Sequence, residues 1–138
     1  MDAHQITNYP NPYEKFGIAQ AYRYGNLIVM SGQIAITPEG EIVGQGDIAA
    51  QAEQAFANIS AILGEVDANL KSIIKMTTYV TDMSKVGEIA PIRTKLFGQP
   101  PPCETLVEVS ALAMPDLMIE IDAMAIVEGI PRPSLPPY

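Results

Sequence analysis

The sequence has one cysteine, one histidine, no tryptophan and only eight lysine or arginine residues among 138. Cys103 alone cannot form an internal disulfide, which indicates a reducing compartment, and we expect a cytoplasmic protein. His4 as the sole histidine nearly excludes Ser-His and Cys-His catalysis and histidine-based zinc sites. The basic residues are scattered singly and the net charge is −8. Nucleic-acid binding is therefore disfavoured, because it needs clustered cations to neutralise phosphates.

Long apolar runs and phosphate-binding loops are also missing. Residues 1–17 contain no basic segment followed by an apolar stretch, so they do not resemble a signal peptide. No apolar stretch approaches the ~20 residues that a helix needs to cross a bilayer, and we expect no membrane partner. No glycine-rich loop matches a nucleotide-binding fingerprint, and no cofactor is expected.

The residues that are present indicate one domain covering 1–138. Hydrophobic residues make up 48% of the chain and charged residues 17%, a balance typical of globular proteins. Periodicity and turn residues predict an α+β order of β-β-β-α-β-α-β-β. The predicted strands cover 19–24, 27–30, 40–43, 72–81, 104–110 and 117–127, and the predicted helices cover 47–66 and 84–97. Residues 129–138 form a proline-rich tail, which we expect to lie on a neighbouring subunit or to be disordered.

The two helix signals differ in strength. Apolar residues recur at three- and four-residue spacing from Ile48 to Val66, and Asp47 is a suitable N-cap. For the second helix, Ser84 is the candidate N-cap, and Pro91 requires the helix to begin near it or to be kinked by it. Two helices cover only one face of a sheet, so we expect oligomerisation to bury the other face or the edges.

Carboxylates on the last two predicted strands are the candidates for chemistry. Alternation places Glu120 and Asp122 on one face of the last strand, and Glu104 and Glu108 on one face of the preceding strand. If these strands pair, several acids come together. Periodicity alone favours a solvated acidic face. A metal site built from these acids is a weaker alternative, because their spacing is not diagnostic, and we predict no metal.

Cys103, which follows three prolines, has two interpretations. It is either a reactive thiol or a small apolar residue at the start of a strand. The second interpretation is favoured because no histidine or basic residue adjoins it in the sequence to stabilise a thiolate.

Four blocks of sequence occur in a characteristic order and spacing. They are NLIVMSGQIAI at 26–36, QAEQAFANISAIL at 51–63, KMTTYVTDM at 75–83 and LVEVSALAMPDLMIEIDAMAIV at 106–127. Together they resemble the RidA/YjgF family of reactive-intermediate deaminases. The resemblance implies a chorismate-mutase-like α+β fold, a mixed sheet with two helices packed on one face. It also implies a homotrimer whose sheets form a central barrel, with three small-molecule clefts between subunits.

The resemblance further implies an activity. Better-known members of the family hydrolyse reactive enamines and imines to a keto acid and ammonia. Carried over by position, the glutamate of the last strand that positions the attacking water is Glu120. The Ser-Gly pair that supplies polar groups nearby is Ser31 and Gly32.

The main departure from the family is at the position of its substrate-binding arginine. The alignment places Glu104 there, with Thr105 and Leu106 beside it as candidate substrate contacts. Two unit charges ~4 Å apart at an effective dielectric of ~20 interact by about 4 kcal/mol. Replacing arginine by glutamate turns attraction for a substrate carboxylate into repulsion, so we expect little activity on 2-imino acids.

Two further positions depart from the family. Ala90 stands where the family has an asparagine in the second helix, and Ile18 stands where it has an aromatic residue. Phe16 or Tyr13 is the candidate replacement for that aromatic side chain.

Two functions fit these residues. The first is a hydrolase for an imine, enamine or related C–N compound, with Glu120 as general base and Glu104 as a second acid that selects ligand charge. The alternative is a non-catalytic, chaperone-like trimer that binds a small metabolite in the same clefts. A Glu104 that points to water, in a cleft without activity, is equally compatible with the sequence. The ribonuclease activity also described for the family ranks third, because the chain is acidic and has few basic residues.

Overall fold

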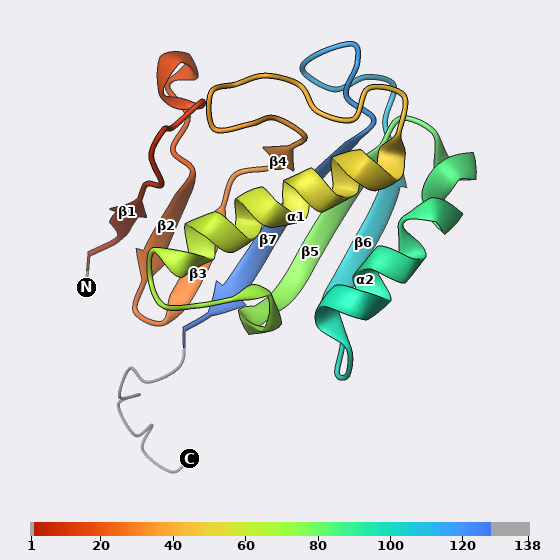
Figure 1. Ribbon diagram of the computed structural model, residues 1–138. Coiled ribbons are helices and arrows are strands. Elements are labelled where there is room, and N and C mark those ends of the chain that lie inside the picture. The colour runs from red at the N-terminus through yellow and green to blue at the C-terminus, as the bar shows by residue number, and fades with distance from the viewer. Residues whose placement is uncertain (1, 128–138) are drawn as a thin grey trace.

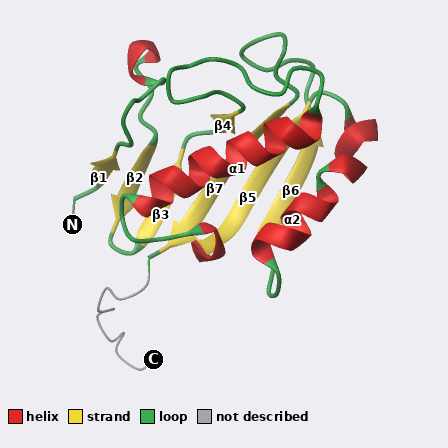
Figure 2. Cartoon of the chain, in the orientation of Figure 1, coloured by secondary structure: helices red, strands yellow, loops and turns green. Residues whose placement is uncertain are grey.

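The computed structural model describes residues 2–127, and the predicted tail at 129–138 lies outside the described residues. One sheet is covered on one face by helices (Figure 1; Figure 2 shows the same view by secondary structure). The strands are β1 (His4–Ile6), β2 (Ala21–Tyr24), β3 (Leu27–Met30), β4 (Gln33–Ile34), β5 (Ile73–Val80), β6 (Cys103–Glu108) and β7 (Ile119–Ile126). The α-helices are α1 (Ile48–Gly64) and α2 (Ala90–Phe97), and short 3-10 helices are η1 (Glu14–Phe16), η2 (Leu70–Ser72) and η3 (Met83–Glu88).

The order of the strands places the middle of β7 beside a break in its neighbour. The sheet runs β1-β2-β3-β7-β5-β6, and β4 also pairs with β7. The β2–β3 hairpin turns at Gly25, whose φ of 61° lies in the left-handed region that glycine adopts without strain. Ser31 and Gly32 separate β3 from β4, and both strands pair antiparallel with β7. The Ser31-Gly32 break therefore lies against β7 near Glu120.

Both α-helices lie on the same face of the sheet, which confirms the predicted α+β arrangement (Figure 2). The predicted N-cap of α1 is confirmed, because the Asp47 carboxylate accepts a hydrogen bond from the Ala50 backbone N–H at 3.1 Å. The face that α1 presents to the sheet is buried: Ile48, Ala52, Ala55, Phe56, Ile59, Ile62 and Leu63. Phe97 of α2 packs edge-on against Phe56, with ring centroids 5.5 Å apart.

The second predicted helix is divided into η3 and α2. Asp82, rather than the predicted Ser84, caps η3, because its carboxylate accepts hydrogen bonds from the Ser84 backbone N–H at 3.0 Å and hydroxyl at 2.6 Å. Pro91 lies in the first turn of α2, where a missing N–H costs no helical hydrogen bond. Of the two predicted alternatives, a helix that begins near Pro91 and one kinked by it, the structure has the first.

Three short segments differ from the prediction. The stretch 40–43 is not a strand and contributes only a single bridge between Ile36 and Ile42. The tight turn before it forms, with the Gly40 N–H donating to the Thr37 carbonyl at 2.8 Å. Strands β1 and β4 were not predicted, because three and two residues are too few for alternation to be visible.

The predicted pairing of the last two strands is wrong. β6 runs parallel to β5, while β7 pairs with the other side of β5. The reason is the connection through α2: a strand, a crossover helix and a second strand form a parallel unit. Glu104 lies opposite Met76 of the helix-covered face, whereas Glu120 lies opposite Tyr79 of the other face. The two glutamates are therefore on opposite faces of the sheet.

The face without helices carries exposed apolar side chains within the described chain. Tyr22, Val29 and Met124 are cross-strand neighbours and are 41%, 41% and 36% exposed. Next to them the same face becomes polar, with Lys75, Thr77 and Asp122. A sheet that buries only one face leaves the other for an additional layer.

Candidate functional site

Glu120 of β7 opens into a cavity of about 530 Å³. Its backbone pairs with Ile34 of β4 and Tyr79 of β5, and its side chain is half-buried. The lining is mostly apolar and comes from three parts of the chain: Tyr13, Lys15, Phe16 and Ile18; Ser31, Gly32, Ile34, Ile36 and Gly40; Ala113 and Met114. An apolar cavity with a few polar groups is the usual form of a small-molecule site.

Gly32 gives the Glu120 carboxylate its position. A Cβ atom added at Gly32 would lie 2.6 Å from Oε1 of Glu120 and 2.7 Å from its Cδ. Any side chain at position 32 would therefore displace the carboxylate. The glycine predicted as a source of polar groups thus has a steric role, which is to let a carboxylate lie against the backbone.

Tyr13 and Ser31 hold the backbone on which that carboxylate rests. The Tyr13 hydroxyl donates to the Gly32 carbonyl at 2.7 Å, and the Tyr13 side chain is only 7% exposed. The Ser31 hydroxyl donates to the Ala19 carbonyl at 2.6 Å, and the Ser31 N–H donates to the Gln20 carbonyl at 2.9 Å. These contacts join the N-terminal segment to the break between β3 and β4.

Phe16 forms the rim of the cavity. It lies on η1, is 63% exposed, and has the Lys15 ammonium 5.0 Å from its ring centroid. Ile18, at the position of the family's aromatic residue, also lines the cavity. Tyr13 and Phe16 thus both lie at the site, Tyr13 inside it and Phe16 at its mouth.

The electrostatics of the cavity favour a protonatable carboxylate. Burial, and secondly the charge of Asp122, raise the pKa of Glu120 above the ordinary glutamate value. Burial and the negative charge of Glu120 likewise raise the pKa of Tyr13, which stays a neutral hydrogen-bond donor. A carboxylate with a raised pKa is a better proton acceptor at neutral pH than an ordinary one.

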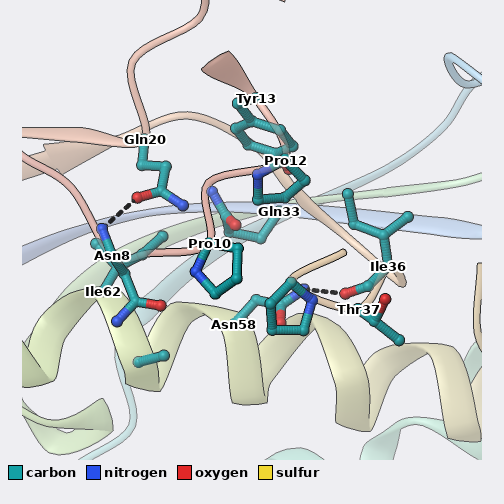
Figure 3. Close-up of a pocket in the computed structure, with 12 residues that line it drawn as sticks. Asn8, Pro10, Pro12, Tyr13, Gln20, Gln33, Ile36, Thr37, Asn58 and Ile62 are labelled. Atoms are coloured by element: carbon teal, nitrogen blue, oxygen red, sulfur yellow. Dashed lines mark hydrogen bonds between the residues drawn. The ribbon is translucent and has the colours of Figure 1, made fainter. Parts of the chain in front are cut away.

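A second, much smaller cavity lies between the N-terminal segment and α1 (Figure 3). Its volume of about 40 Å³ suits water and not a metabolite. The hydrogen bonds around it tie the chain together: the Asn8 N–H donates to the Gln20 side chain at 2.6 Å, and the Asn58 amide donates to the Ile36 carbonyl at 2.9 Å. We assign this cavity a structural role, because it anchors the segment that carries Tyr13.

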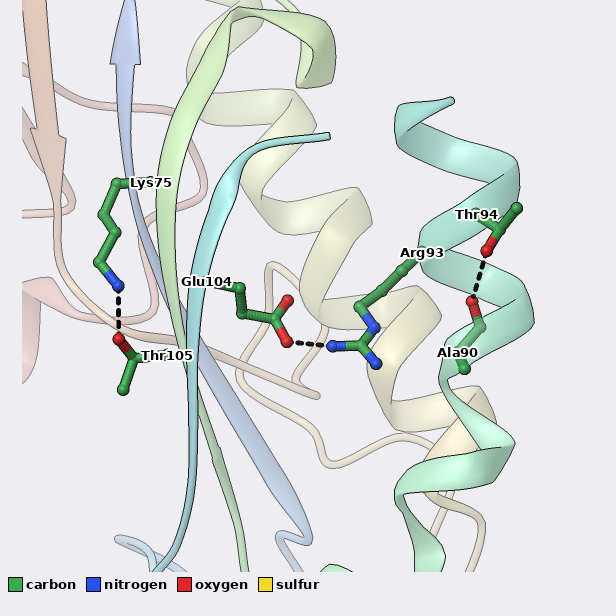
Figure 4. Close-up of polar contacts among 6 residues, drawn as sticks. All are labelled: Lys75, Ala90, Arg93, Thr94, Glu104 and Thr105. Carbon is green, nitrogen blue, oxygen red and sulfur yellow. Dashed lines mark hydrogen bonds and ion pairs between the residues drawn. The ribbon is translucent and has the colours of Figure 1, made fainter. Parts of the chain in front are cut away.

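Glu104 lies away from Glu120, on the other face of the sheet. Its carboxylate forms an ion pair with the guanidinium of Arg93 on α2 (Figure 4). Both residues line a groove of about 350 Å³ together with Ala90, Thr94 and residues of the 98–102 turn. The prediction that Glu104 and Glu120 share one pocket is not met within a single chain, because β6 pairs with β5 and not with β7.

The remaining predicted contacts also lie outside the Glu120 cavity. Thr105 is on the face without helices, where its hydroxyl accepts a hydrogen bond from the Lys75 ammonium at 2.6 Å (Figure 4). Leu106 points the other way and packs against the hydrophobic core. Cys103 is a free, exposed cysteine at the start of β6.

Sequence reasoning missed Arg93 altogether. Its only signal was its place one turn after Ala90 on a predicted helix, which does not reveal a partner on a later strand. The steric match between Gly32 and Glu120 was also hidden, because the two residues are far apart in the sequence and meet only through the pairing of β4 with β7.

Residues 2–127 lack two other kinds of feature, a metal-binding cluster and a membrane-spanning helix. No group of three or more histidine, cysteine, aspartate or glutamate side chains in this range is arranged to hold a metal ion. None of the helices described there has the length and apolar character needed to cross a bilayer.

Comparisons with known proteins agree with this architecture. A family model described as Endoribonuclease L-PSP matches residues 7–127. A RutC family protein of Pyrococcus abyssi is 41% identical over 108 residues, which cover 78% of this chain and 84% of the relative. The structure of the YjgF gene product of E. coli has a TM-score of 0.80 at 30% identity, over 89% of this chain and 98% of that one. RidA of an Antarctic Psychrobacter has a TM-score of 0.82 at 28% identity, over 90% and 99%.

The matched range contains every strand and helix of the described chain from β2 to β7, together with the Glu120 cavity. The structural matches include the mixed sheet with both α-helices on one face, as the sequence blocks predicted. The chain belongs to the RidA/YjgF family and has its fold.

Proposed function

We propose that this protein is a deaminase-type hydrolase that acts on an imine, enamine or related small C–N metabolite. The observation that carries this proposal is the Glu120 carboxylate, half-buried in an apolar cavity of about 530 Å³ and held against Gly32. Its raised pKa suits general-base catalysis at neutral pH. In the proposed reaction Glu120 takes a proton from water as the water oxygen bonds to the C=N carbon. The proton is returned to nitrogen, and the carbinolamine breaks down to a carbonyl compound and ammonia.

The cavity around Glu120 supplies the surroundings that such a reaction needs. Apolar residues such as Ile34, Ile36 and Met114 exclude bulk water from the reacting carbon. Phe16 at the mouth offers a flat surface for a planar, conjugated substrate. Tyr13 and Ser31 keep the backbone beside Glu120 fixed, so the base does not have to be reorganised during the reaction.

The active form is proposed to be a homotrimer with its sites between subunits. The face that lacks helices exposes Tyr22, Val29 and Met124, an apolar surface that an adjoining sheet would bury. Arg93 and Glu104 lie on α2 and on the edge strand β6, on the opposite face of the sheet from Glu120. A neighbouring subunit can bring its β6 edge to the Glu120 cavity, which would complete one cleft from two chains.

Ammonia release tests the proposal directly. Amine and amino-acid oxidases would generate a panel of imines in situ, and the purified trimer should speed ammonia release from at least one of them above the rate in buffer. Mass by light scattering checks assembly in the same samples. A folded trimer that binds members of the panel and never speeds hydrolysis would support the alternative, a non-catalytic, chaperone-like binding protein.

RNA cleavage, which the description of the matching family model names, is not favoured by this chain. Its net charge is −8, and its eight basic residues are distributed singly. Contact with an RNA backbone depends on clustered cations. An RNA substrate is therefore a suitable negative control in the ammonia assay.

A further inference from the structure

The polar groove of α2 and β6 is organised by a pair of opposite charges and not by a lone acid. Arg93 is 25% exposed and Glu104 is 17% exposed, so the pair is partly desolvated but still open to a ligand. The two side chains reach towards each other from a helix and a strand that both pack into the same core (Figure 4). Within residues 2–127 the hydrogen bond that they share is the only one made by either side chain.

The pair changes the charge that a ligand meets. An unpaired Glu104 would present one negative charge and repel a carboxylate. Arg93 neutralises it, so the groove has no net charge at this point. At the same time Arg93 does not become a simple carboxylate receptor, because a second carboxylate would have to lie beside the oxygens of Glu104.

The atoms left over by the pair form a donor beside an acceptor. A guanidinium has five N–H donors and a carboxylate has two acceptor oxygens, while the ion pair joins one nitrogen to one oxygen. The other N–H groups of Arg93 and the second oxygen of Glu104 remain for a ligand. A ligand group that complements them presents an acceptor next to a donor, as a primary carboxamide or a ureido group does. A carboxylate presents two acceptors, and one of them would face the oxygen of Glu104.

The groove has room for such a group. Its volume is about 350 Å³, and the short side chain of Ala90 lies one turn before Arg93 on the same face of α2. The Thr94 hydroxyl is turned back to the Ala90 carbonyl at 3.2 Å. Met76 lines the apolar side of the groove.

From these contacts we infer that the Arg93–Glu104 pair selects substrates that carry a neutral carboxamide or ureido group in place of a carboxylate. This inference rests on the proposed function, since the groove must face the reacting C–N bond across a subunit boundary. Arg93 and Glu104 are specificity-determining residues in this scheme, and Glu120 remains the base. The substrate class is then an imine or enamine of an amide or a urea derivative.

Two product-like probes test the inference without turnover. Pyruvate and pyruvamide have nearly the same size and differ in a carboxylate or a carboxamide beside the ketone. Their dissociation constants would be measured by NMR titration of the assembled protein. We expect the wild type to bind pyruvamide roughly tenfold more tightly than pyruvate, the effect of about one charged hydrogen bond. A wild type that prefers pyruvate, binds both equally or binds neither would overturn the inference.

Variants assign the preference to the pair. Glu104→Gln frees the guanidinium and should raise pyruvate affinity by roughly tenfold or more, so that the amide preference is lost. Arg93→Gln should weaken the binding of pyruvate further. The double exchange Arg93→Glu with Glu104→Arg keeps a neutral pair and should keep the preference. Lys95→Gln, which removes an exposed positive charge from the same helix, is the matched control and should change nothing. An amide preference that neither single variant, Glu104→Gln nor Arg93→Gln, alters would assign recognition to other residues.

The outcome is separable from that of the proposed function. If the enzyme releases ammonia from the panel but shows no dependence on Arg93 or Glu104, the hydrolase stands and this inference fails. If the probes behave as expected but no imine is hydrolysed, the groove is a recognition site in a binding protein.

Discussion

Glu120 and Glu104 are carboxylates on strands of one sheet, and their surroundings differ. Glu120 lies in an apolar cavity next to Gly32, and burial together with Asp122 raises its pKa. Glu104 lies on the opposite face and is paired with Arg93, the only salt bridge in residues 2–127. The two surroundings underlie the different roles that we propose for the two residues. Burial without a cationic partner raises the pKa of Glu120, as its proposed role of base requires, whereas Glu104 belongs to the ion pair that we propose as a recognition element.

Removing the proton-accepting group of Glu120 should have the largest effect. Glu120→Gln preserves size and hydrogen-bonding shape, and the apolar neighbours Ile119 and Ile121 point to the buried face, so folding should survive. Loss of a positioned base should lower the rate of ammonia release by ~10²–10⁴-fold. Steady-state assays on the best substrate of the imine panel would measure it.

A matched control for this variant is Glu53→Gln. Glu53 is an exposed acid on α1 and lies outside the lining of the Glu120 cavity and of the groove that holds Arg93 and Glu104. It should retain the wild-type rate. Equal rates in Glu120→Gln and wild type, with both proteins folded and assembled, would show that Glu120 is not a general base and would favour the binding-protein alternative.

Displacing the Glu120 carboxylate without removing it should have the next largest effect. In Gly32→Ala the new Cβ would lie 2.6 Å from Oε1 of Glu120, so the carboxylate must move away from the backbone. A displacement of about 1 Å at a catalytic group costs up to ~10²-fold in rate. We expect a loss of roughly that size in kcat. Gly64→Ala is the control, because its Cβ would meet no atom within 4 Å. If Gly32→Ala kept full activity, the position of the Glu120 carboxylate would not be important.

Much of the fold could be predicted from sequence because its strongest signals are local. The repeat of apolar residues from Ile48 to Leu63 defined α1, and strict alternation defined which face of β7 is buried. Pairing between strands was not visible, because it depends on which side of β5 the chain occupies after α2. Without knowledge of that pairing, the sequence-based interpretation brought Glu104 and Glu120 together, whereas they lie on opposite faces of the sheet.

Four residues that the sequence singled out, Glu120, Ser31, Gly32 and Phe16, line one cavity. Their roles in catalysis or binding stay predictions. The pairing of Arg93 with Glu104 was not predictable, since a charge on one face of a helix is usually solvated and nothing in the sequence indicated its partner. The importance of space at Gly32 depends on a contact between β7 and the break after β3, which only the assembled sheet reveals.

The smallest expected effect is on stability, and it again separates Glu120 from the other acids. The folded state holds the pKa of Glu120 above the ordinary value, so between the two values the folded protein keeps a proton that the unfolded chain has released. Because the unfolded state then binds fewer protons, the free energy of unfolding falls as pH rises. The favourable contribution is complete below the ordinary glutamate pKa and is lost as pH rises through the folded value. At neutral pH the ionised Glu120 side chain therefore lowers the free energy of unfolding.

Replacing Glu120 with glutamine should abolish this pH dependence. Near pH 4 wild type and Glu120→Gln should be similar, and by pH 8 the variant should be the more stable of the two. We expect a difference below about 1 kcal/mol, because Glu120 is only half-buried and solvent screens its charge. Urea unfolding between pH 4 and pH 8 would measure this difference in the free energy of unfolding. One fixed subunit concentration keeps the contribution of subunit association constant. Glu53→Gln should show no such trend, since Glu53 is exposed on α1. If the gap between wild type and Glu120→Gln does not widen with pH, burial does not oppose the charge of Glu120, and the argument for a base with a raised pKa loses its basis.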